Sequence, residues 1–152
     1  MNMETRWIPF RLPAEARVDR LREFNSREEI RWFGFEGSFL PPATARIAFR
    51  RIEKGALGGG GTDAINGGVI AAGFDAAFVL AGLGQYSVDV VVTLDLSIQF
   101  LNLARVSDSV AFHVGVVKSS KNFCFASGVL FDPQAPDMPH FARATAMLAP
   151  AR

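Results

Sequence analysis

The sequence predicts an α+β domain in which a curled antiparallel sheet wraps around one central apolar helix. Three observations support this prediction. Residues 67–84 are almost wholly apolar over the length of a buried helix, and residues 88–100 alternate as a half-buried strand does. Residues 108–118 and 122–132 are two further strand patterns, and the three-residue connection between them indicates an antiparallel hairpin. A sheet can bury so apolar a helix only by curling around it, which gives two packed layers.

The composition excludes several classes of protein. With 49% apolar residues, 20% charged residues and 14 Phe among 152 residues, the chain suits one folded domain, and intrinsic disorder is excluded. The net charge of +1 creates no basic field that would attract nucleic acid. A single cysteine, Cys124, excludes an intramolecular disulfide and any metal site built from several cysteines.

Residues 67–84 are better interpreted as a core helix than as a membrane span. They fall short of the ~20 apolar residues that a bilayer needs, and Asp75 lies in their middle. Residues 1–7 carry charges where a secretory signal needs an apolar run. We therefore expect a cytoplasmic protein that does not bind membranes.

The first 35 residues are expected to form a helical arm. Residues 13–33 are the most charged part of the chain, with apolar side chains at helical spacing and Pro13 suited to a helix start. Ser26 and the two glutamates that follow it indicate a second helix, which ends near Gly34. Such an arm can bind a partner, but more often it covers an edge of its own domain. The main domain is then expected to span residues 36–150.

The other strands are predicted from alternating side chains. Residues 45–50 follow Pro41-Pro42 and alternate, and residues 141–148 form the last strand. The glycine-rich loop 54–61 lacks the Lys and Ser/Thr of a phosphate-binding loop and is interpreted as a turn. In the long strand at 88–100 we expect one buried face, made of Val88, Val90, Val92, Leu94, Leu96, Ile98 and Phe100.

The first candidate for chemistry is Asp75 in the middle of the apolar helix. Its neighbours three and four residues away are all apolar: Ala71, Ala72, Phe78 and Val79. A carboxylate among apolar groups is costly, and such groups often mark functional sites. The alternative is an aspartate at a helix edge that reaches water or a backbone N–H.

The second candidate is Asn66-Gly67-Gly68 at the start of the same helix. Asn is a favourable N-cap, and two glycines leave the first N–H groups unshielded. These N–H groups and the positive end of the helix dipole suit an oxyanion or a polarised carbonyl. A plain cap with tight packing explains the same residues equally well.

The two candidates lie too far apart along one helix to act on one bond. Asp75 follows Asn66 by nine residues, and a helix rises about 1.5 Å per residue, so the two stand roughly 12–14 Å apart. If both act together, Asp75 of one subunit must meet the Gly67 region of another. Catalysis at these residues therefore requires a dimer.

The stretch from Asn66-Gly67-Gly68-Val69 to Asp75-Ala76-Ala77 resembles the His-Gly-Gly…Asp/Glu helix signature of hotdog-fold acyl-CoA thioesterases, in particular the phenylacetic-acid-degradation type. The similarity continues through residues 93–101, 108–110 and 118–122, and covers residues 36–150. It implies a hotdog fold and an enzyme that hydrolyses an acyl or aryl-acyl thioester to a free acid and coenzyme A. It also implies a homodimer within a dimer of dimers. No resident cofactor is implied, because coenzyme A enters only as part of the substrate.

The resemblance assigns roles to the two candidates. Asp75 stands at the position of the acidic catalytic residue, as a nucleophile or as a general base on water. Gly67 matches the glycine whose N–H polarises the thioester carbonyl, assisted by the helix dipole and by Gly68. Asn66 stands where the family usually has His, and it can cap the helix or donate a hydrogen bond but cannot titrate.

Other residues are weaker candidates. Lys118 and Lys121 match the hairpin region that approaches the phosphates of coenzyme A, with solvated surface lysines as the alternative. Lone histidines such as His113 and His140 are more often structural or interfacial than catalytic, and neither has the partners that a metal site needs. Cys124, between two phenylalanines, is expected to be buried and inert.

Thioester hydrolysis is therefore the predicted activity, with the acyl group in a pocket rich in Phe. One alternative is an acyl-CoA-binding or assembly domain without catalysis, which the Asn at position 66 favours. A hotdog hydratase or dehydratase is the other alternative, and it has less support because the helix lacks an Asp-x-x-x-x-His arrangement.

Overall fold

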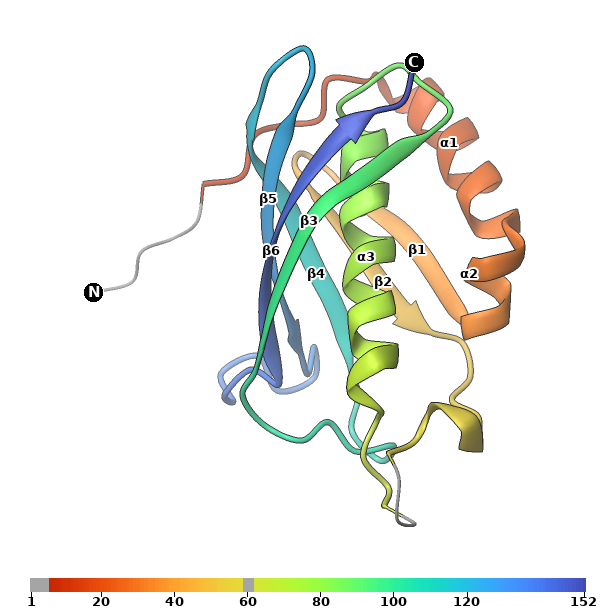
Figure 1. The fold of residues 1–152 in the computed structure, drawn as a ribbon, viewed down its shortest axis with the longest axis vertical. Helices are drawn as coiled ribbons and strands as arrows, with labels where there is room; N and C mark the ends of the chain where they lie inside the picture. Colours follow the sequence, from red (N-terminus) through yellow and green to blue (C-terminus); the bar gives the residue numbers. More distant parts are fainter. Residues whose placement is uncertain (1–5, 59–61) are drawn as a thin grey trace.

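The computed structural model describes residues 6–58 and 62–152, so part of the glycine-rich loop and the first five residues lie outside the described part of the chain. Two helices precede the strands in the chain, and one long helix packs against the sheet that the strands form (Figure 1). The elements are α1 (Ala14–Ser26), α2 (Glu28–Phe33), β1 (Phe35–Leu40), β2 (Thr44–Phe49), the short 3-10 helix η1 (Lys54–Ala56), α3 (Gly67–Leu83), β3 (Val91–Phe100), β4 (Ala111–Ser119), β5 (Cys124–Phe131) and β6 (Ala142–Pro150).

The strands form one six-stranded sheet that curls around α3. Its order is β1-β2-β4-β5-β6-β3, and every pair of neighbours is antiparallel. Helix α3 contacts all six strands from the concave side, as Figure 1 shows. This is the predicted α+β architecture, and the β4–β5 hairpin confirms the antiparallel pair expected from the short connection at residues 119–121.

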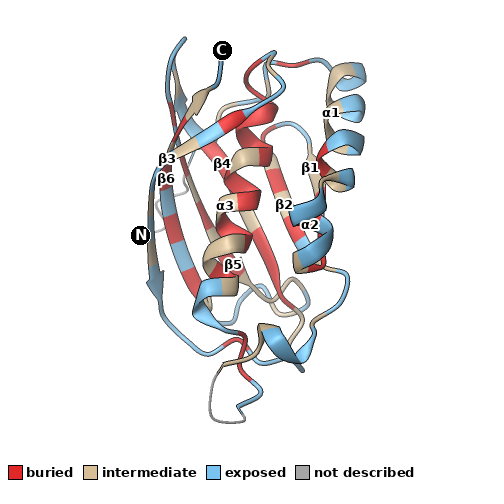
Figure 2. Cartoon of the chain, turned by 45° about the vertical axis from the view of Figure 1, so that its right-hand side comes forward, coloured by how far each residue is buried: buried red, intermediate tan, exposed pale blue. Residues whose placement is uncertain are grey.

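The core lies between α3 and the concave face of the sheet (Figure 2). Phe74, Phe78 and Leu80 of α3 are fully buried there, and Phe112 of β4 packs edge-on against Phe74 with ring centroids 5.1 Å apart. None of the helices in the described residues is long and apolar enough to span a membrane. The apolar helix owes its composition to burial by the curled sheet, with α1 packed against a further part of it.

The N-terminal arm covers the β1 edge of the sheet. Asn25 on α1 mimics a neighbouring strand, because its Nδ2 donates to the Gly37 carbonyl at 3.0 Å and its Oδ1 accepts from the Gly37 N–H at 2.7 Å. A Cβ at Gly37 would lie 2.8 Å from Leu80 and 2.9 Å from Phe24, so only glycine lets α1 approach this closely. The edge-covering interpretation of the arm is confirmed.

Strand β1 itself was not expected from the sequence. Its residues, Phe-Glu-Gly-Ser-Phe-Leu, alternate only over the first three positions and lie between Gly34 and the Pro41-Pro42 pair. The strand exists because β2 pairs with one side of it and Asn25 with the other. Both of these partners are supplied by tertiary structure.

The prediction of one buried face for residues 88–100 is wrong in part. Val91 is buried, but a β-bulge between Thr93 and Asp95 shifts the alternation by one residue. After the bulge Leu96 and Ile98 pack against the core. The expected apolar face is therefore split, and four of its members are exposed: Val90, Val92, Leu94 and Phe100. The physical reason is that β3 pairs only with β6 among the described strands, so one of its sides is an open edge.

Candidate functional site

The start of α3 is built as the sequence predicted. Asn66 is the N-cap, and the Gly68 N–H donates to its Oδ1 at 2.7 Å. Gly68 is thereby already engaged, which corrects the expectation that its N–H would assist a ligand. The Gly67 N–H, in contrast, has no acceptor within the described residues, and the whole helix start is exposed. One backbone donor at the positive end of a 17-residue helix is therefore free.

The loop before α3 is held in place by the backbone on both sides. The Asn66 N–H donates to the Ala56 carbonyl at 2.8 Å, and the Ile65 N–H donates to the Ala104 carbonyl at 2.7 Å. Asp63 forms an ion pair with Arg105. These contacts fix the direction of the free Gly67 N–H without using it.

Asp75 lies half-buried on the side of α3 that faces the start of β3. Its Oδ1 accepts a hydrogen bond from the Thr93 hydroxyl at 2.5 Å. The carboxylate therefore has a partner that was not expected from the sequence. Thr93 belongs to the polar half of the predicted alternation, and it turns inward because the bulge comes directly after it.

Asp75 lines a cavity of about 220 Å³ between α3 and the arm, called here the Asp75 cavity. Three phenylalanines, Phe24, Phe33 and Phe35, form much of its wall, and Arg27 is its one cationic residue. The complete lining is Phe24, Arg27, Glu29, Ile30, Phe33, Phe35, Ala72, Asp75, Ala76, Val79 and Val91. A carboxylate thus meets an apolar, aromatic space, and half of that space is supplied by the arm.

A second cavity of about 270 Å³ lies nearer to the start of α3. It is lined by Trp32, Phe33, Arg51, Glu53, Gly55, Ala56 and Val69. Phe33 belongs to both cavities, so the end of α2 separates the space around Asp75 from the space around Val69. This use of the arm was not expected from the sequence. The apolar residues Trp32 and Phe33 at the end of a highly charged segment were the signal that could have indicated it.

Gly67 and Asp75 do not meet within one chain. Helix α3 runs unbroken from Gly67 to Leu83, so eight residues separate the two by a rise of about 12 Å. Each of them nevertheless lies beside β3. Thr93 near the start of the strand contacts Asp75, and the Phe100 ring at its end lies 3.5 Å from where a Cβ on Gly67 would stand.

Lys118 and Lys121 lie at the other end of the molecule from Gly67. They flank the tip of the β4–β5 hairpin, and the Tyr86 hydroxyl just after α3 donates to the Ser120 carbonyl at 2.8 Å. Figure 1 shows this tip near the end of α3, whereas Gly67 is at the start. Within one chain these lysines are therefore not brought to the same place as Gly67.

Cys124 is fully buried, as expected. Burial raises the pKa of its thiol to about 11, so the thiol stays protonated at neutral pH and is a poor nucleophile. Within residues 6–58 and 62–152, no three His, Cys, Asp or Glu side chains gather in a way that could hold a metal ion. His113 and His140 lie on the outer face of the sheet and line a different cavity.

Comparison with known proteins bears on the family and the fold. Residues 63–137 match the family model described as the thioesterase superfamily. No curated protein gives a match to the sequence. The matched residues identify this part of the chain with the thioesterase superfamily, and the chain has the hotdog fold.

Solved structures share the fold at low sequence identity. The Escherichia coli PaaI protein, from the phenylacetic acid degradation operon, superimposes with a TM-score of 0.77 at 14% identity, over 91% of this chain and 96% of that one. A thioesterase family protein from Silicibacter pomeroyi gives 0.73 at 19% identity, over 88% and 96%. Zebra fish thioesterase superfamily member 2 gives 0.72 at 15% identity, over 92% and 99%.

Proposed function

We propose that the protein hydrolyses an acyl-CoA or aryl-acyl-CoA thioester to a free acid and coenzyme A. The observation that carries this proposal is the Asp75 carboxylate at the wall of an aromatic cavity, held by Thr93. An acyl group with an apolar body suits the phenylalanines of the Asp75 cavity. The charged remainder of the substrate would stay outside the Asp75 cavity, in contact with solvent.

Asp75 is proposed to start the reaction. As a general base it takes a proton from water while the water oxygen attacks the thioester carbon. As a nucleophile it forms an anhydride, which water then hydrolyses. In both routes the C–S bond breaks and the thiolate of coenzyme A leaves with a proton. The Thr93 hydroxyl orients the carboxylate and leaves its second oxygen for the substrate.

The developing oxyanion is proposed to bind at the free Gly67 N–H. This donor has the helix dipole behind it, and no described residue competes for it. Asn66 acts by capping the helix, since its Oδ1 is occupied by the Gly68 N–H. A titrating His at position 66 is therefore not needed to keep the oxyanion donor in place.

The complete site is proposed to form between two subunits that pair along β3. A strand that pairs with its own copy about a two-fold axis does so antiparallel, so the start of one strand faces the end of the other. Asp75 lies beside the start of β3 and Gly67 beside its end. Such pairing brings Asp75 of one subunit toward Gly67 of its partner, and it covers the exposed Val92 and Leu94.

Some features remain predictions that rest on the sequence. A dimer of dimers is one, and a cytoplasmic location is another. Contact of Lys118 and Lys121 with the phosphates of coenzyme A is a third. Because the hairpin tip is distant from Gly67 in one chain, these lysines would have to serve a site whose Gly67 belongs to another subunit.

A binding domain without catalysis is the competing function, and Asn66 in place of the usual His favours it. Free-thiol release from a panel of acyl-CoAs separates the two. We expect turnover by the wild type and a loss of at least a hundredfold in Asp75→Asn, with little change in stability because Asn still accepts from Thr93. Asp137→Asn, which removes an exposed carboxylate outside α3 and β3, is the matched control. Binding of acyl-CoA without thiol release by the wild type would establish the competing function.

Complementation tests the shared site. Asp75→Asn removes the base, and Gly67→Pro removes the proposed oxyanion donor. A chain of each kind, refolded together, gives heterodimers in which one site is intact and the other carries both lesions. Random mixing should restore about a quarter of the wild-type activity per subunit. A mixture as inactive as its parents, although mass spectrometry shows heterodimers, would contradict the shared site.

A further inference from the structure

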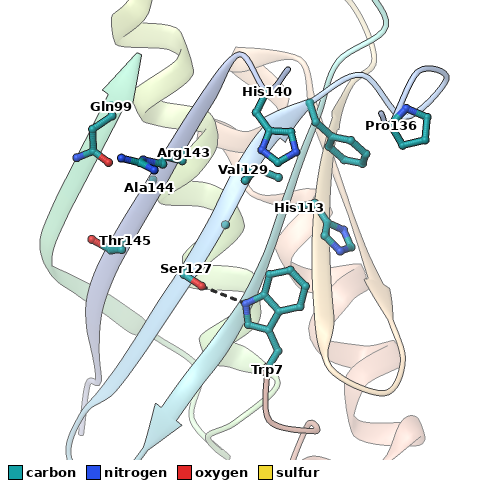
Figure 3. Close-up of a pocket in the computed structure, with 12 residues that line it drawn as sticks. Trp7, Gln99, His113, Ser127, Val129, Pro136, His140, Arg143, Ala144 and Thr145 are labelled. Carbon is teal, nitrogen blue, oxygen red and sulfur yellow. Dashed lines mark hydrogen bonds between the residues drawn. The ribbon is translucent and has the colours of Figure 1, made fainter. Parts of the chain in front are cut away.

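A large cavity lies on the outer face of the sheet, the face turned away from α3. It measures about 910 Å³ and is called here the outer-face cavity. Figure 3 shows the side chains that line it, which project from β3, β4, β5 and β6. Trp7 reaches over them from the segment before α1. The sheet separates this cavity from Asp75 and Gly67, so it is not part of the proposed hydrolytic site.

Strand register places five outward-facing residues of this face in one row across the sheet. The row consists of Arg46, His113, Val129, Arg143 and Gln99. Its centre is apolar and its flanks are polar, because the small Val129 lies between the larger side chains. At a strand spacing of about 4.8 Å, the backbones of the two arginines are roughly 14 Å apart.

Aromatic rings form the walls above this row. The Trp7 indole packs over Gly115, where a Cβ would lie 2.3 Å from the ring, and its Nε1 donates to Ser127 Oγ at 3.2 Å. The His113 ring lies edge-on to Trp7 at 5.4 Å and to Phe131 at 5.9 Å. A single hydrogen bond and close packing thus fix the indole, and Val129 lines the same cavity as the rings of Trp7, His113 and Phe131.

The lining of the outer-face cavity carries positive charge only. Its lining contains Arg143 and no carboxylate. Neither Arg143 nor Arg46 forms an ion pair with any residue in the described ranges. A cavity with an unneutralised guanidinium beside an apolar floor favours an anion with an apolar body.

Arg46 acts on the cavity through His113. Its guanidinium donates to His113 Nδ1 at 3.3 Å and lies over the Phe131 ring at 5.4 Å. Because Nδ1 accepts, the imidazole proton is on Nε2, which is left as a donor on a cavity-lining residue. Arg46 is therefore a positioning residue that holds the tautomer of His113.

We propose that the outer-face cavity binds a small organic carboxylate with a flat apolar body. The carboxylate accepts from Arg143, with His113 Nε2–H as a further donor, and the body lies over Val129 between Trp7 and Phe131. The volume of the cavity is within the range of small-molecule sites. This binding is independent of the proposed hydrolysis, because the two sites lie on opposite faces of the sheet.

Tryptophan fluorescence tests the proposal, because the chain has only two tryptophans and Trp32 is exposed on the arm. In a Trp32→Phe background the signal comes from Trp7 alone. We expect a saturable change with benzoate and none with benzamide, which has the same shape without the charge. Arg143→Gln should weaken benzoate binding at least tenfold, as expected for loss of a charge-assisted contact. Arg22→Gln, on the outside of α1, removes the same charge elsewhere and should leave it unchanged.

Further outcomes would overturn the proposal. Equal responses to benzoate and to inorganic phosphate would show a general anion site without recognition of the apolar body. Absence of a saturable response would exclude the carboxylate ligand, and ultracentrifugation would then show whether a second copy of the chain covers this face. Arg143 is exposed, so its substitution should leave the fold intact. Thermal unfolding of Arg143→Gln checks this, and Arg46→Gln should cause a smaller loss of affinity than Arg143→Gln.

Discussion

The two edges of the sheet are treated in opposite ways. At the β1 edge, the arm folds back and Asn25 bonds to both backbone groups of Gly37. At the β3 edge, no described strand or helix pairs with the outer side, and Val92 and Leu94 are exposed. Figure 1 shows the two edges on opposite sides of α3, with the arm beside one of them only.

This difference fits the proposed pairing of two subunits along β3. An unpaired edge with apolar side chains invites another strand, and proteins usually block such an edge. Here the chain blocks β1 with its own residues and leaves β3 open, next to Asp75 and Gly67. Stability of the single subunit should therefore depend on the β1 edge, and assembly of the active site on the β3 edge.

The largest expected effect on stability comes from Phe24→Ala at the closed edge. Phe24 is 1% exposed, and its ring packs from α1 onto Gly37 of β1. Truncation of a buried phenylalanine costs about 3–5 kcal/mol of unfolding free energy, which urea unfolding measures. Val18→Ala on the same helix, where the side chain is 56% exposed, should change it by no more than about 0.5 kcal/mol. A loss below about 1 kcal/mol in Phe24→Ala would mean that the arm is not part of the folded unit.

Asn25→Ala should have the next largest effect. It leaves the N–H and the carbonyl of Gly37 without their partners, at a cost of about 1–3 kcal/mol. Hydrogen exchange should show faster exchange of the Gly37 amide, whereas amides in the β4–β5 hairpin keep their protection. Asn25→Asp, which retains the acceptor for the Gly37 N–H, should lose less unfolding free energy than Asn25→Ala. Equal exchange at Gly37 in the wild type and Asn25→Ala would argue against edge capping by this residue.

Charge at the open edge should hardly affect the subunit but should prevent its association. Leu94→Lys changes a half-exposed side chain, so the unfolding free energy of the monomer should shift by about 0.5 kcal/mol or less. Sedimentation velocity should show the wild type at least as a dimer and Leu94→Lys at half the mass of the wild type or less, with loss of the proposed thioesterase activity. Val18→Lys, an equal change on the arm, should keep the mass of the wild type. An active Leu94→Lys protein with the mass of the wild type would remove β3 from the interface.

The smallest effect on the unfolding free energy is expected from a change of pH. It should act through His113 on β4, which lies between the two edges of the sheet. Burial, and then the nearby Arg46 charge, lower the pKa of His113 below 6.5. As pH falls through 6.5 the unfolded chain takes up a proton first, so the unfolding free energy should decrease until the folded pKa is reached. Urea midpoints at pH 7.5 and pH 5.5 should differ less in His113→Gln than in the wild type. A retained difference in His113→Gln that disappears in His140→Gln would assign the effect to the other histidine.

The long helix, its cap and the hairpin were predictable because their signals are local. Asn66 caps α3 through an N–H only two residues away, and the apolar run that follows needs no knowledge of its partners to be recognised. The β4–β5 hairpin is likewise determined by a short connection between two apolar strands. Asp75 was also identifiable, since a carboxylate within such a run is unusual whatever surrounds it.

Only the tertiary structure decided the two edges, the inward turn of Thr93 and the outer-face cavity. The bulge at β3 depends on pairing with β6, and β1 is a strand because β2 and Asn25 occupy its two sides. Trp7 completes the outer-face cavity from more than 100 residues away in sequence, since Ser127 accepts its hydrogen bond. Side-chain periodicity reports which face of a segment can be buried, but the identity of the neighbour that buries it, or its absence, depends on long-range pairing.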